Sequence, residues 1–290
     1  MSHLTQQPTA MNSANIIHPG FYSSIQDLGR KAYRDLGVPH SGAMDQEAMR
    51  LANSALGNTA DAAVLEMIMQ GVTLVFSQLT FVMVIGVVDE VKVNDEVQDF
   101  SKPIKIKSGD RLKIGRMVKG HFAYLAITSG WQSEKVMGSR SMFHGITPLA
   151  RLSKGDVLKY QKEGLNIPKG HSVALNYYNK LNVHKGPEFH ALPEDYKIYL
   201  ANTEFKVSAS WNRMAYVLKT DKAVDVEQIA TAPVLPGTIQ LTPAGDLNLL
   251  MRDAQTTGGY PRILQLSDQA INQLTRKQVG ETILFTMVDV

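Results

Sequence analysis

The sequence predicts a mainly β protein with two domains and a few short helices, and three observations support this prediction. The chain has 290 residues, which is enough for two domains of ordinary size. Short runs rich in Val, Ile, Leu, Tyr and Phe alternate with turns of Gly, Asp, Asn, Ser and Lys. A Gly-acidic turn leads into a strand three times, at residues 109–110, 155–156 and 280–281. Closed barrels or sandwiches are the usual way to bury many short strands.

The strands are expected to begin well after the start of the chain. Residues 1–14 are polar and lack the basic start and apolar core of a secretory signal, so we expect a disordered tail there. Later runs of β-branched, aromatic and aliphatic residues predict strands at Val72–Phe76, Thr80–Val88, Arg111–Ile114, Phe122–Thr128, Val157–Tyr160, Ser172–Leu175, Lys197–Leu200, Phe205–Ser208, Ala215–Lys219, Thr238–Leu241, Leu247–Met251, Arg262–Leu266 and Thr282–Val288.

Two helices are expected between these strands. Asp45 can accept hydrogen bonds from the free amides that begin Gln46–Leu56, and Gly57 ends this helix. Ser267 or Asp268 can cap a second helix near the end of the chain.

A change in composition indicates the domain boundary. Between residues 160 and 172 the chain is rich in Lys, Glu, Gly, Asn and Pro. We therefore expect an N-terminal β domain at 15–162 and a C-terminal β domain at 163–290.

Composition and charge exclude several classes of function. The net charge is +3 and no run of five like charges occurs, so neither a nucleic-acid partner nor a membrane surface is indicated. The longest apolar run, Phe81–Val88, is far shorter than the roughly 20 residues of a membrane-spanning helix. The absence of cysteine excludes disulfides, thiolate metal sites and cysteine nucleophiles, and it is consistent with a reducing compartment. We expect a soluble, cytoplasmic protein.

Common catalytic motifs do not occur in the chain. It contains no phosphate loop, no G-x-G-x-x-G, no H-E-x-x-H and no G-x-S-x-G. The eight histidines show no metal-ligand spacing, so no metal held by the protein is expected. An Ala-Met-Lys-Met attachment site is also lacking, so we expect no covalent biotin on this chain.

Polar residues gather among glycines and apolar residues in the first third of the chain. They are Gln26, Asp27, Arg30, Asn53 and Glu66. Burying them unpaired would be costly, so they must satisfy one another or a ligand. One interpretation is a substrate site. The other is a hydrogen-bond network that closes a barrel, with Asp27 or Glu66 paired to Arg30.

A second group lies near the C-terminus and has the composition of a binding loop. Glycines there would let the backbone approach a ligand while neighbouring side chains supply donors and acceptors. The alternative is a wide turn whose polar side chains cap its own backbone. The candidate residues are Arg213, Gln240, Asp253, Gln255, Thr256, Thr257, Gly258, Gly259 and Tyr260.

Six segments, in order, resemble the signature of a known family. They are Gln26-Asp-Leu-Gly-Arg30, Gly37-Val-Pro-x-Ser-Gly-x-Met-Asp45, Gly138-Ser-Arg-Ser141, Asn212-Arg-Met214, Pro236-Gly-x-Ile-Gln240 and Asp253-x-Gln-Thr-Thr-Gly-Gly-Tyr-Pro261. The chain resembles the allophanate hydrolase subunit 2 family over about residues 15–290. That family includes the KipA-like proteins, the C subunit of 5-oxoprolinase and the biotin-dependent carboxyltransferase half of urea carboxylase.

The resemblance implies two cyclophilin-like β-barrel domains and a chain that works within a hetero-oligomer. The tight partner would be the B subunit of 5-oxoprolinase, and the A subunit would complete the reaction. In this hydrolase, 5-oxo-L-proline, ATP and water give L-glutamate, ADP and phosphate. ATP with Mg²⁺ would be a co-substrate shared with the partner chain. We therefore expect the chain to be inactive alone.

The chemical type of the candidate residues indicates a role for each in such a reaction. Phosphorylating the lactam oxygen would create a leaving group and accelerate ring opening. Arg30 and Arg213 would stabilise anions, and Asp27 and Asp253 would handle protons or magnesium. The remaining polar residues of both groups would bind the substrate, with Gln240, Gln255, Thr256 and Tyr260 placing it.

Two alternatives stay open from the sequence. The chain could be one component of a biotin-dependent carboxyltransferase that acts on urea or a related amide. It could also be a KipA-type regulatory binding protein.

Overall fold

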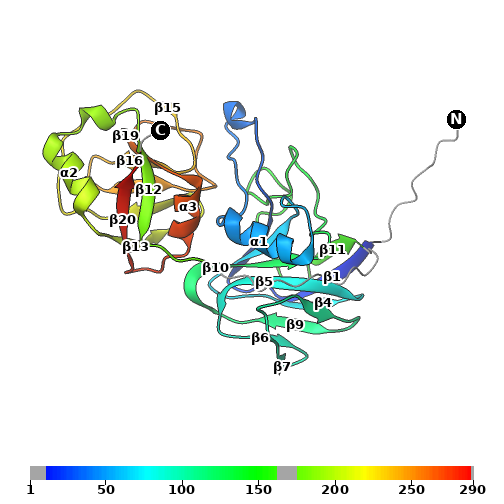
Figure 1. Ribbon diagram of the computed structural model, residues 1–290. Coiled ribbons are helices and arrows are strands. Elements are labelled where there is room, and N and C mark those ends of the chain that lie inside the picture. Colours follow the sequence, from blue (N-terminus) through cyan, green and yellow to red (C-terminus); the bar gives the residue numbers. More distant parts are fainter. Residues whose placement is uncertain (1–10, 162–174, 289–290) are drawn as a thin grey trace.

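The computed structural model describes residues 11–161 and 175–288, which form two β units side by side (Figure 1). The predicted boundary between residues 162 and 163 lies outside the described residues, as do residues 1–10 of the predicted tail. The prediction of a disordered tail is wrong for residues 11–14, because these residues begin strand β1 (Met11–His18). Ala14 and Ile16 alternate with polar residues and are buried, so this polar segment has one apolar face.

The N-terminal unit consists of two antiparallel sheets that enclose one core. The first sheet contains, in spatial order, β11 (Val157–Gln161), β1, β4 (Thr73–Phe76), β9 (Arg111–Ile114), β6 (Val91–Val93) and β7 (Glu96–Val97). The second contains β2 (Tyr22–Gln26), β3 (Val64–Ile68), β10 (Met117–Ile127), β5 (Thr80–Val88) and β8 (Ile104–Ile106). Helix α1 (Gln46–Leu56) packs on the outer face of the second sheet.

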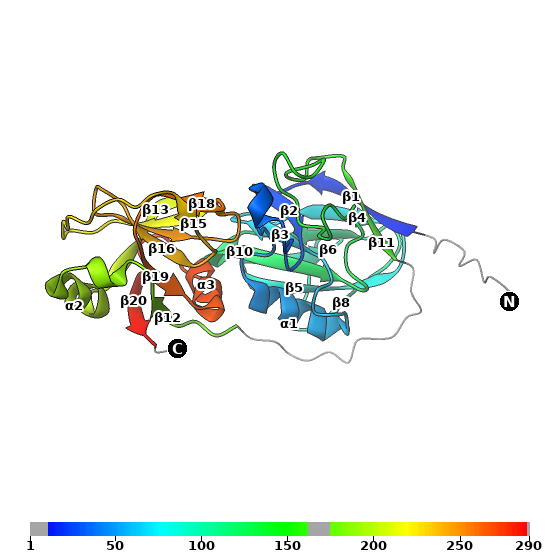
Figure 2. The same ribbon diagram turned by 90° about the horizontal axis from the view of Figure 1, so that it is seen from above.

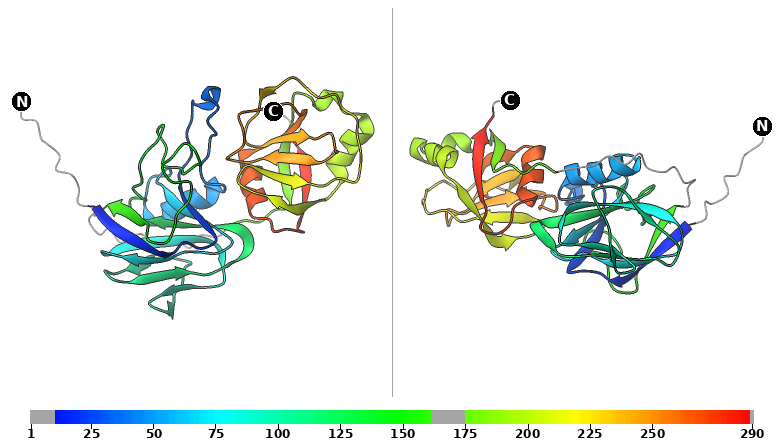
Figure 3. Two further views of the ribbon diagram at one scale, coloured as in Figure 1. Left: turned by 180° about the vertical axis from the view of Figure 1, so that it is seen from behind. Right: turned by 60° about the horizontal axis from the view of Figure 1, so that its bottom comes forward.

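The C-terminal unit is a closed barrel, seen best from behind (Figure 3, left). Its strands follow the spatial order β12 (Lys180–Lys185), β19 (Arg262–Leu266), β16 (Thr238–Leu241), β17 (Leu247–Leu250), β14 (Ala215–Leu218), β13 (Phe205–Trp211) and β20 (Thr282–Met287). The short elements are η2 (Phe189–Ala191), α2 (Glu194–Asn202), α3 (Asp268–Thr275), β15 (Ala232–Pro233) and β18 (Thr257–Gly258). The mainly β prediction is confirmed.

Local signals for caps and turns were accurate. Asp45 caps α1 by accepting from the Ala48 amide at 2.9 Å, and Gly57 ends the helix with φ 72°. Ser267 caps α3. The glycines of the three Gly-acidic turns have φ values of 82°, 92° and 89°, so each takes the left-handed conformation that glycine tolerates best.

One predicted strand is wrong and another is only partly described. Residues 197–200 belong to α2, where Pro193 precedes an acidic first turn. Tyr196 and Leu200 are buried and lie four residues apart, which is a helical spacing. The predicted strand at 172–175 falls almost wholly outside the described residues. Within the described part of the chain, no helix is long and apolar enough to cross a membrane.

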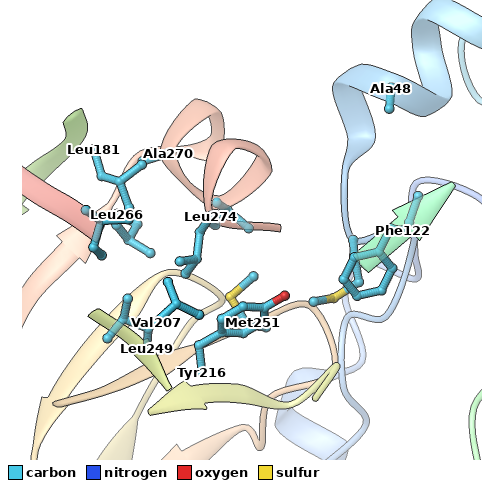
Figure 4. Close-up of a cluster of buried hydrophobic side chains, with 14 of the residues drawn as sticks. Ala48, Phe122, Leu181, Val207, Tyr216, Leu249, Met251, Leu266, Ala270 and Leu274 are labelled. Atoms are coloured by element: carbon cyan, nitrogen blue, oxygen red, sulfur yellow. The ribbon is translucent and has the colours of Figure 1, made fainter. Parts of the chain in front are cut away.

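The two units share a hydrophobic core, and this contact positions the site. One buried cluster combines residues of α1 and the second sheet with residues of the barrel. Figure 4 shows Phe122 of β10 facing Tyr216 and Met251 across the junction. Nearby, Arg276 follows α3 and binds both oxygens of Asp45 at 2.6 and 3.0 Å. The units therefore meet through apolar packing and a buried ion pair.

Candidate active site

A cavity of about 560 Å³ is lined by residues of both units. The two units lie next to each other in the view of Figure 2 as they do in Figure 1. Apolar and aromatic side chains form most of its wall, and the pair of Arg213 and Asp253 gives it a polar end. This combination is typical of small-molecule sites. The lining residues are Phe21, Tyr22, Ile68, Met69, Met142, Phe143, His144, Ala209, Trp211, Asn212, Arg213, Met214 and Asp253.

Glu66 lies in the middle of β3, and its side chain points toward the C-terminal unit. Its neighbours Val64 and Ile68 belong to the core shared by the units, while Leu65 and Met67 face the core between the two sheets. The alternation of a strand therefore places the carboxylate on the side of the barrel. Glu66 accepts a hydrogen bond from the Met44 amide at 2.7 Å and is 1% exposed.

Arg213 reaches Glu66 from the turn between β13 and β14. The Asn212 side-chain oxygen accepts from the amides of Met214 and Ala215 at 2.7 and 3.0 Å, which shapes this turn. The Arg213 guanidinium binds both oxygens of Asp253 at 2.7 and 2.9 Å. It also donates to a carboxylate oxygen of Glu66 and to the Gly42 carbonyl, the latter at 2.8 Å.

The Arg213–Glu66–Asp253 cluster holds one cation and two carboxylates. Burial alone would lower the pKa of Arg213, but the charges of Asp253 and Glu66 outweigh burial and raise it. Burial raises the pKa of Glu66, and the positive charge of Arg213 partly offsets this effect. Asp253 has a 12% exposed side chain and lines the cavity, so it is the carboxylate that a ligand meets.

The donors of Arg213 are almost fully used. A guanidinium has five N–H groups. Among the described residues, four of them bind Asp253, Glu66 and Gly42. The fifth N–H makes no hydrogen bond to any described residue.

Asp27 lies on the N-terminal unit, beside a different and more polar cavity of about 360 Å³. Its carboxylate accepts from the Gly29 amide, the Ser139 hydroxyl, the Arg140 amide and the Ser141 hydroxyl at 2.6–2.8 Å. A carboxylate with four donors holds the Gly138-Ser-Arg-Ser141 segment in place. The geometry therefore favours a positioning role for Asp27.

Arg30 is buried next to Ser141 of the same segment. It donates to the Ser41 hydroxyl at 3.0 Å and to the Ser141 carbonyl, and it is 1% exposed. Burial lowers its pKa, and the charge of Asp27 opposes this shift. The pairing of Arg30 with Asp27 or Glu66 that the sequence left open is replaced by these neutral partners.

Gln26 and Asn53 are buried and bind their own unit. The Gln26 amide donates to Ser24 and to the Met142 carbonyl at 2.9 and 3.2 Å. The Asn53 amide donates to the Ala62 carbonyl at 2.7 Å and its oxygen accepts from Asn58 at 2.9 Å. Gln26 thus binds within β2 and to the loop at Met142, and Asn53 connects α1 to the loop that follows it. Neither residue lines the cavity between the units.

The second predicted group forms a compact loop on the barrel. The Gln240 amide donates to the Tyr260 carbonyl at 3.4 Å, and Gln255 donates to the Gln240 oxygen at 3.5 Å. A Cβ atom at Gly258 would lie 2.6 Å from the Gln240 amide nitrogen, so this glycine makes room for a side chain of its own barrel. Thr256, Thr257 and Gly259 belong to the same loop, in which β18 pairs with β15.

The sequence did not predict the aromatic wall of the cavity. It also did not predict that Arg34 binds the barrel loop. Trp211 directly precedes the Asn212-Arg-Met214 motif, and Phe143 follows Gly138-Ser-Arg-Ser141, so adjacency to the motifs was the available signal. Arg34, in η1 (Arg34–Leu36), donates to the Val234 carbonyl and lies 3.4 Å from the carbonyls of Gln255 and Thr256.

The predicted residues therefore separate into three places. Glu66, Arg213 and Asp253 meet at the cavity between the units. Gln26, Asp27, Arg30 and Asn53 support the N-terminal unit. Gln240 of β16 and the residues 255–260 lie together on the barrel. The cavity can bind a small, partly apolar molecule, hydrogen bond its oxygen and accept a proton from it.

Comparisons with known proteins concern the family and the fold of the chain. Residues 36–287 match the family model of the carboxyltransferase domain, subdomains A and B. The 5-oxoprolinase C subunit of Escherichia coli (strain K12) is 32% identical over 277 residues, which are 93% of this chain and 89% of that protein. The protein of the same name from Haemophilus influenzae is 28% identical over 274 residues, with 92% and 88% covered. The urea carboxylase structure from Kluyveromyces lactis superposes with a TM-score of 0.86 at 26% identity, over 98% of this chain but only 28% of that chain.

Proposed function

The chain belongs to the carboxyltransferase domain family, subdomains A and B, and from this premise we propose that it acts as the C subunit of an ATP-dependent 5-oxoprolinase. Two relatives that carry the name of this C subunit align over nearly their whole length. The single observation that carries the proposal is the cavity between the units, with Arg213 and Asp253 at its polar end. It offers an N–H donor and a carboxylate side by side, as hydrolysis of a cyclic amide requires.

Arg213 and Asp253 have complementary roles in this proposal. The remaining N–H of Arg213 donates to the amide oxygen of the bound lactam and holds it in place for activation. Asp253 accepts a proton from the attacking water. Glu66 is too buried to touch the substrate and instead positions Arg213.

The nucleotide is assigned to the partner chains. The described residues contain no group of three or more His, Asp or Glu side chains that could hold a metal ion. The oxygens of Asp27 already accept from four groups, and both oxygens of Asp253 accept from Arg213. These carboxylates therefore do not fit a Mg²⁺ site on this chain. When bound to the complex, ATP with Mg²⁺ would supply the phosphoryl group that activates the amide.

The proposal also concerns the cellular compartment and the partner chains. The A and B subunits of 5-oxoprolinase are the expected partners in the cytoplasm, and the chain alone is expected to be inactive. The test is reconstitution of the three chains, with ADP release followed in the presence and absence of 5-oxo-L-proline. ADP release should require the lactam and all three chains. Robust turnover by this chain alone, or lactam-independent ADP release, would contradict the proposal.

A second candidate function has one observation in its favour. The fold superposes over 98% of this chain on part of a urea carboxylase. The same cavity could hold urea or a related amide as the acceptor of a carboxyl group carried by biotin on another protein. A complex with a biotin carboxylase and a biotin carrier that carboxylates urea, and does not hydrolyse 5-oxo-L-proline, would favour this function.

A further inference from the structure

Trp211 is the largest aromatic side chain of the cavity wall, and it is held by residues of both units. Its ring stacks on His121 with ring centroids 3.9 Å apart and an angle of 12° between the planes. Phe122 and Tyr216 contact it from the sides, with centroids 5.9 and 5.7 Å away. Trp211 ends β13 of the barrel, whereas His121 and Phe122 belong to β10 of the other unit. The stack therefore fixes the indole across the junction.

His121 has the properties of a support for Trp211. It is 8% exposed, and its Nε2 atom finds no hydrogen-bond partner among the described residues. A buried histidine kept for hydrogen bonding would normally have a partner for that atom. Burial lowers the pKa of His121 to about 4, so its ring is neutral near pH 7, and Glu281 opposes this shift. Its backbone carbonyl also accepts from the amide of Met69, another residue of the cavity wall.

The cavity combines a flat aromatic surface with a polar end. Trp211, Phe21 and Phe143 belong to its wall, and Asn212 and Arg213 follow Trp211 directly in the chain. A planar amide ring has two faces without hydrogen-bonding groups and an edge that carries N–H and C=O groups. Such a ring can stack on the indole while its edge reaches the polar end.

We propose that Trp211 is the surface on which a planar cyclic amide or ureido group stacks, and that His121 is the positioning residue that keeps the indole in that orientation. The inference rests on the proposed function for the identity of the natural ligand. It goes beyond that function because it assigns Trp211 as the side chain that contacts the flat face of the ring. The lactam of 5-oxoproline and a cyclic urea share this chemistry, and binding experiments distinguish them.

The direct test observes Trp211 in the assembled complex. The sequence contains two tryptophans, so the chain labelled with 5-fluorotryptophan and joined to unlabelled A and B subunits should give two ¹⁹F resonances. The Trp211→Phe variant assigns them. The probes are 5-oxo-L-proline, 2-imidazolidinone and L-proline, the last of which has the same ring size but no planar amide. We expect a saturable shift of the Trp211 resonance with one or both planar rings and none with L-proline. Equal shifts with L-proline, or no shift with any probe, would overturn the proposal.

Kinetics test the role of His121 separately. In the complex, His121→Ala should raise KM for 5-oxo-L-proline about three- to tenfold with little change in kcat, because a stacking contact affects binding. His121→Phe should restore most of the loss because it keeps an aromatic face. The exposed His190 provides a matched control, and His190→Ala should leave KM unchanged. Unchanged KM in His121→Ala, or no rescue by Phe, would refute the positioning role.

The two proposals fail in different ways. If the complex releases no ADP with 5-oxo-L-proline but 2-imidazolidinone shifts the Trp211 resonance, the oxoprolinase function is wrong and the stacking surface stands. If the complex hydrolyses 5-oxo-L-proline but Trp211 and His121 variants behave as the parent, the stacking surface is wrong. Should His121→Ala fail to fold, the parent ¹⁹F titration and the His121→Phe kinetics still decide.

Discussion

Replacing Arg213 by Met tests whether the cluster at the cavity depends on its single cation. Met is unbranched and has no charge, so Glu66 and Asp253 would remain as neighbouring carboxylates without a cation. Arg213 and Glu66 are 7% and 1% exposed, so both charges are largely removed from water. Removing one partner of a buried ion pair typically costs about 3–5 kcal/mol. For a chain of 290 residues this corresponds to a fall in Tm of about 6–10 °C.

The assay is thermal melting of the purified chain at pH 7, followed by far-ultraviolet circular dichroism. Glu66→Gln combined with Arg213→Met should recover part of the loss, because it removes one of the two unpaired carboxylates. Lys219→Met is the matched control, since Lys219 pairs with Asp246 at the surface and its side chain is 68% exposed. That control should change the stability by about 1 kcal/mol or less. If Arg213→Met melts within about 2 °C of the parent, which is the size of the effect expected for one surface pair, the cluster does not hold the junction together.

Two further predictions concern the barrel loop and the domain junction. Gln255→Ala should change stability by less than about 1 kcal/mol, because its amide makes a single 3.5 Å contact and its Oε1 atom is buried without a partner among the described residues. We expect turnover of the complex to fall nonetheless; an early melt with turnover at the parent rate would instead assign the loop a structural role. His121 has a pKa of about 4 in the folded chain, below the usual value of 6.5, so the unfolded chain takes up the proton first as the pH falls. Stability should therefore be lost between pH 6.5 and pH 4, by at most about 3 kcal/mol, and urea titrations of His121→Phe should lack this component.

Local signals in the sequence were sufficient for many elements of the fold. The predicted bounds of Thr80–Val88, Arg111–Ile114, Thr238–Leu241 and Arg262–Leu266 agree with the strands of the structure. Helix α1 also begins and ends as predicted, because its cap residues determine both ends. These elements depend on short runs of residues and on turn chemistry, both of which can be read along the chain.

Strand β3 shows why other elements were missed. All five of its residues, Val64–Ile68, are buried, so the polar alternation that marks a half-exposed strand is absent. The sequence instead presents Glu66 among apolar neighbours. Its partner Arg213 lies 147 residues further along the chain. A buried carboxylate in a strand becomes plausible only when this partner is known.

The candidate site illustrates the same limit. Glu66, Arg213 and Asp253 were each identified from their local surroundings, but their meeting depends on how the barrel packs against the second sheet. Asp27 was identified equally well, and the structure places it in a separate hydrogen-bond network with Ser139 and Ser141. Composition and spacing indicate which residues are unusual. They do not indicate which unusual residues share a cavity.

The most direct measurement of the central claim is ADP release by the assembled complex carrying Asp253→Asn. Asn keeps the shape of Asp253 and loses the carboxylate that faces the cavity. The account predicts that kcat/KM for 5-oxo-L-proline falls by about 100-fold or more, as expected for loss of a general base. Asp246→Asn, which removes a carboxylate of the same barrel that pairs with Lys219 and does not line the cavity, should stay within about twofold of the parent. Full lactam-dependent turnover by the Asp253→Asn complex would contradict the account.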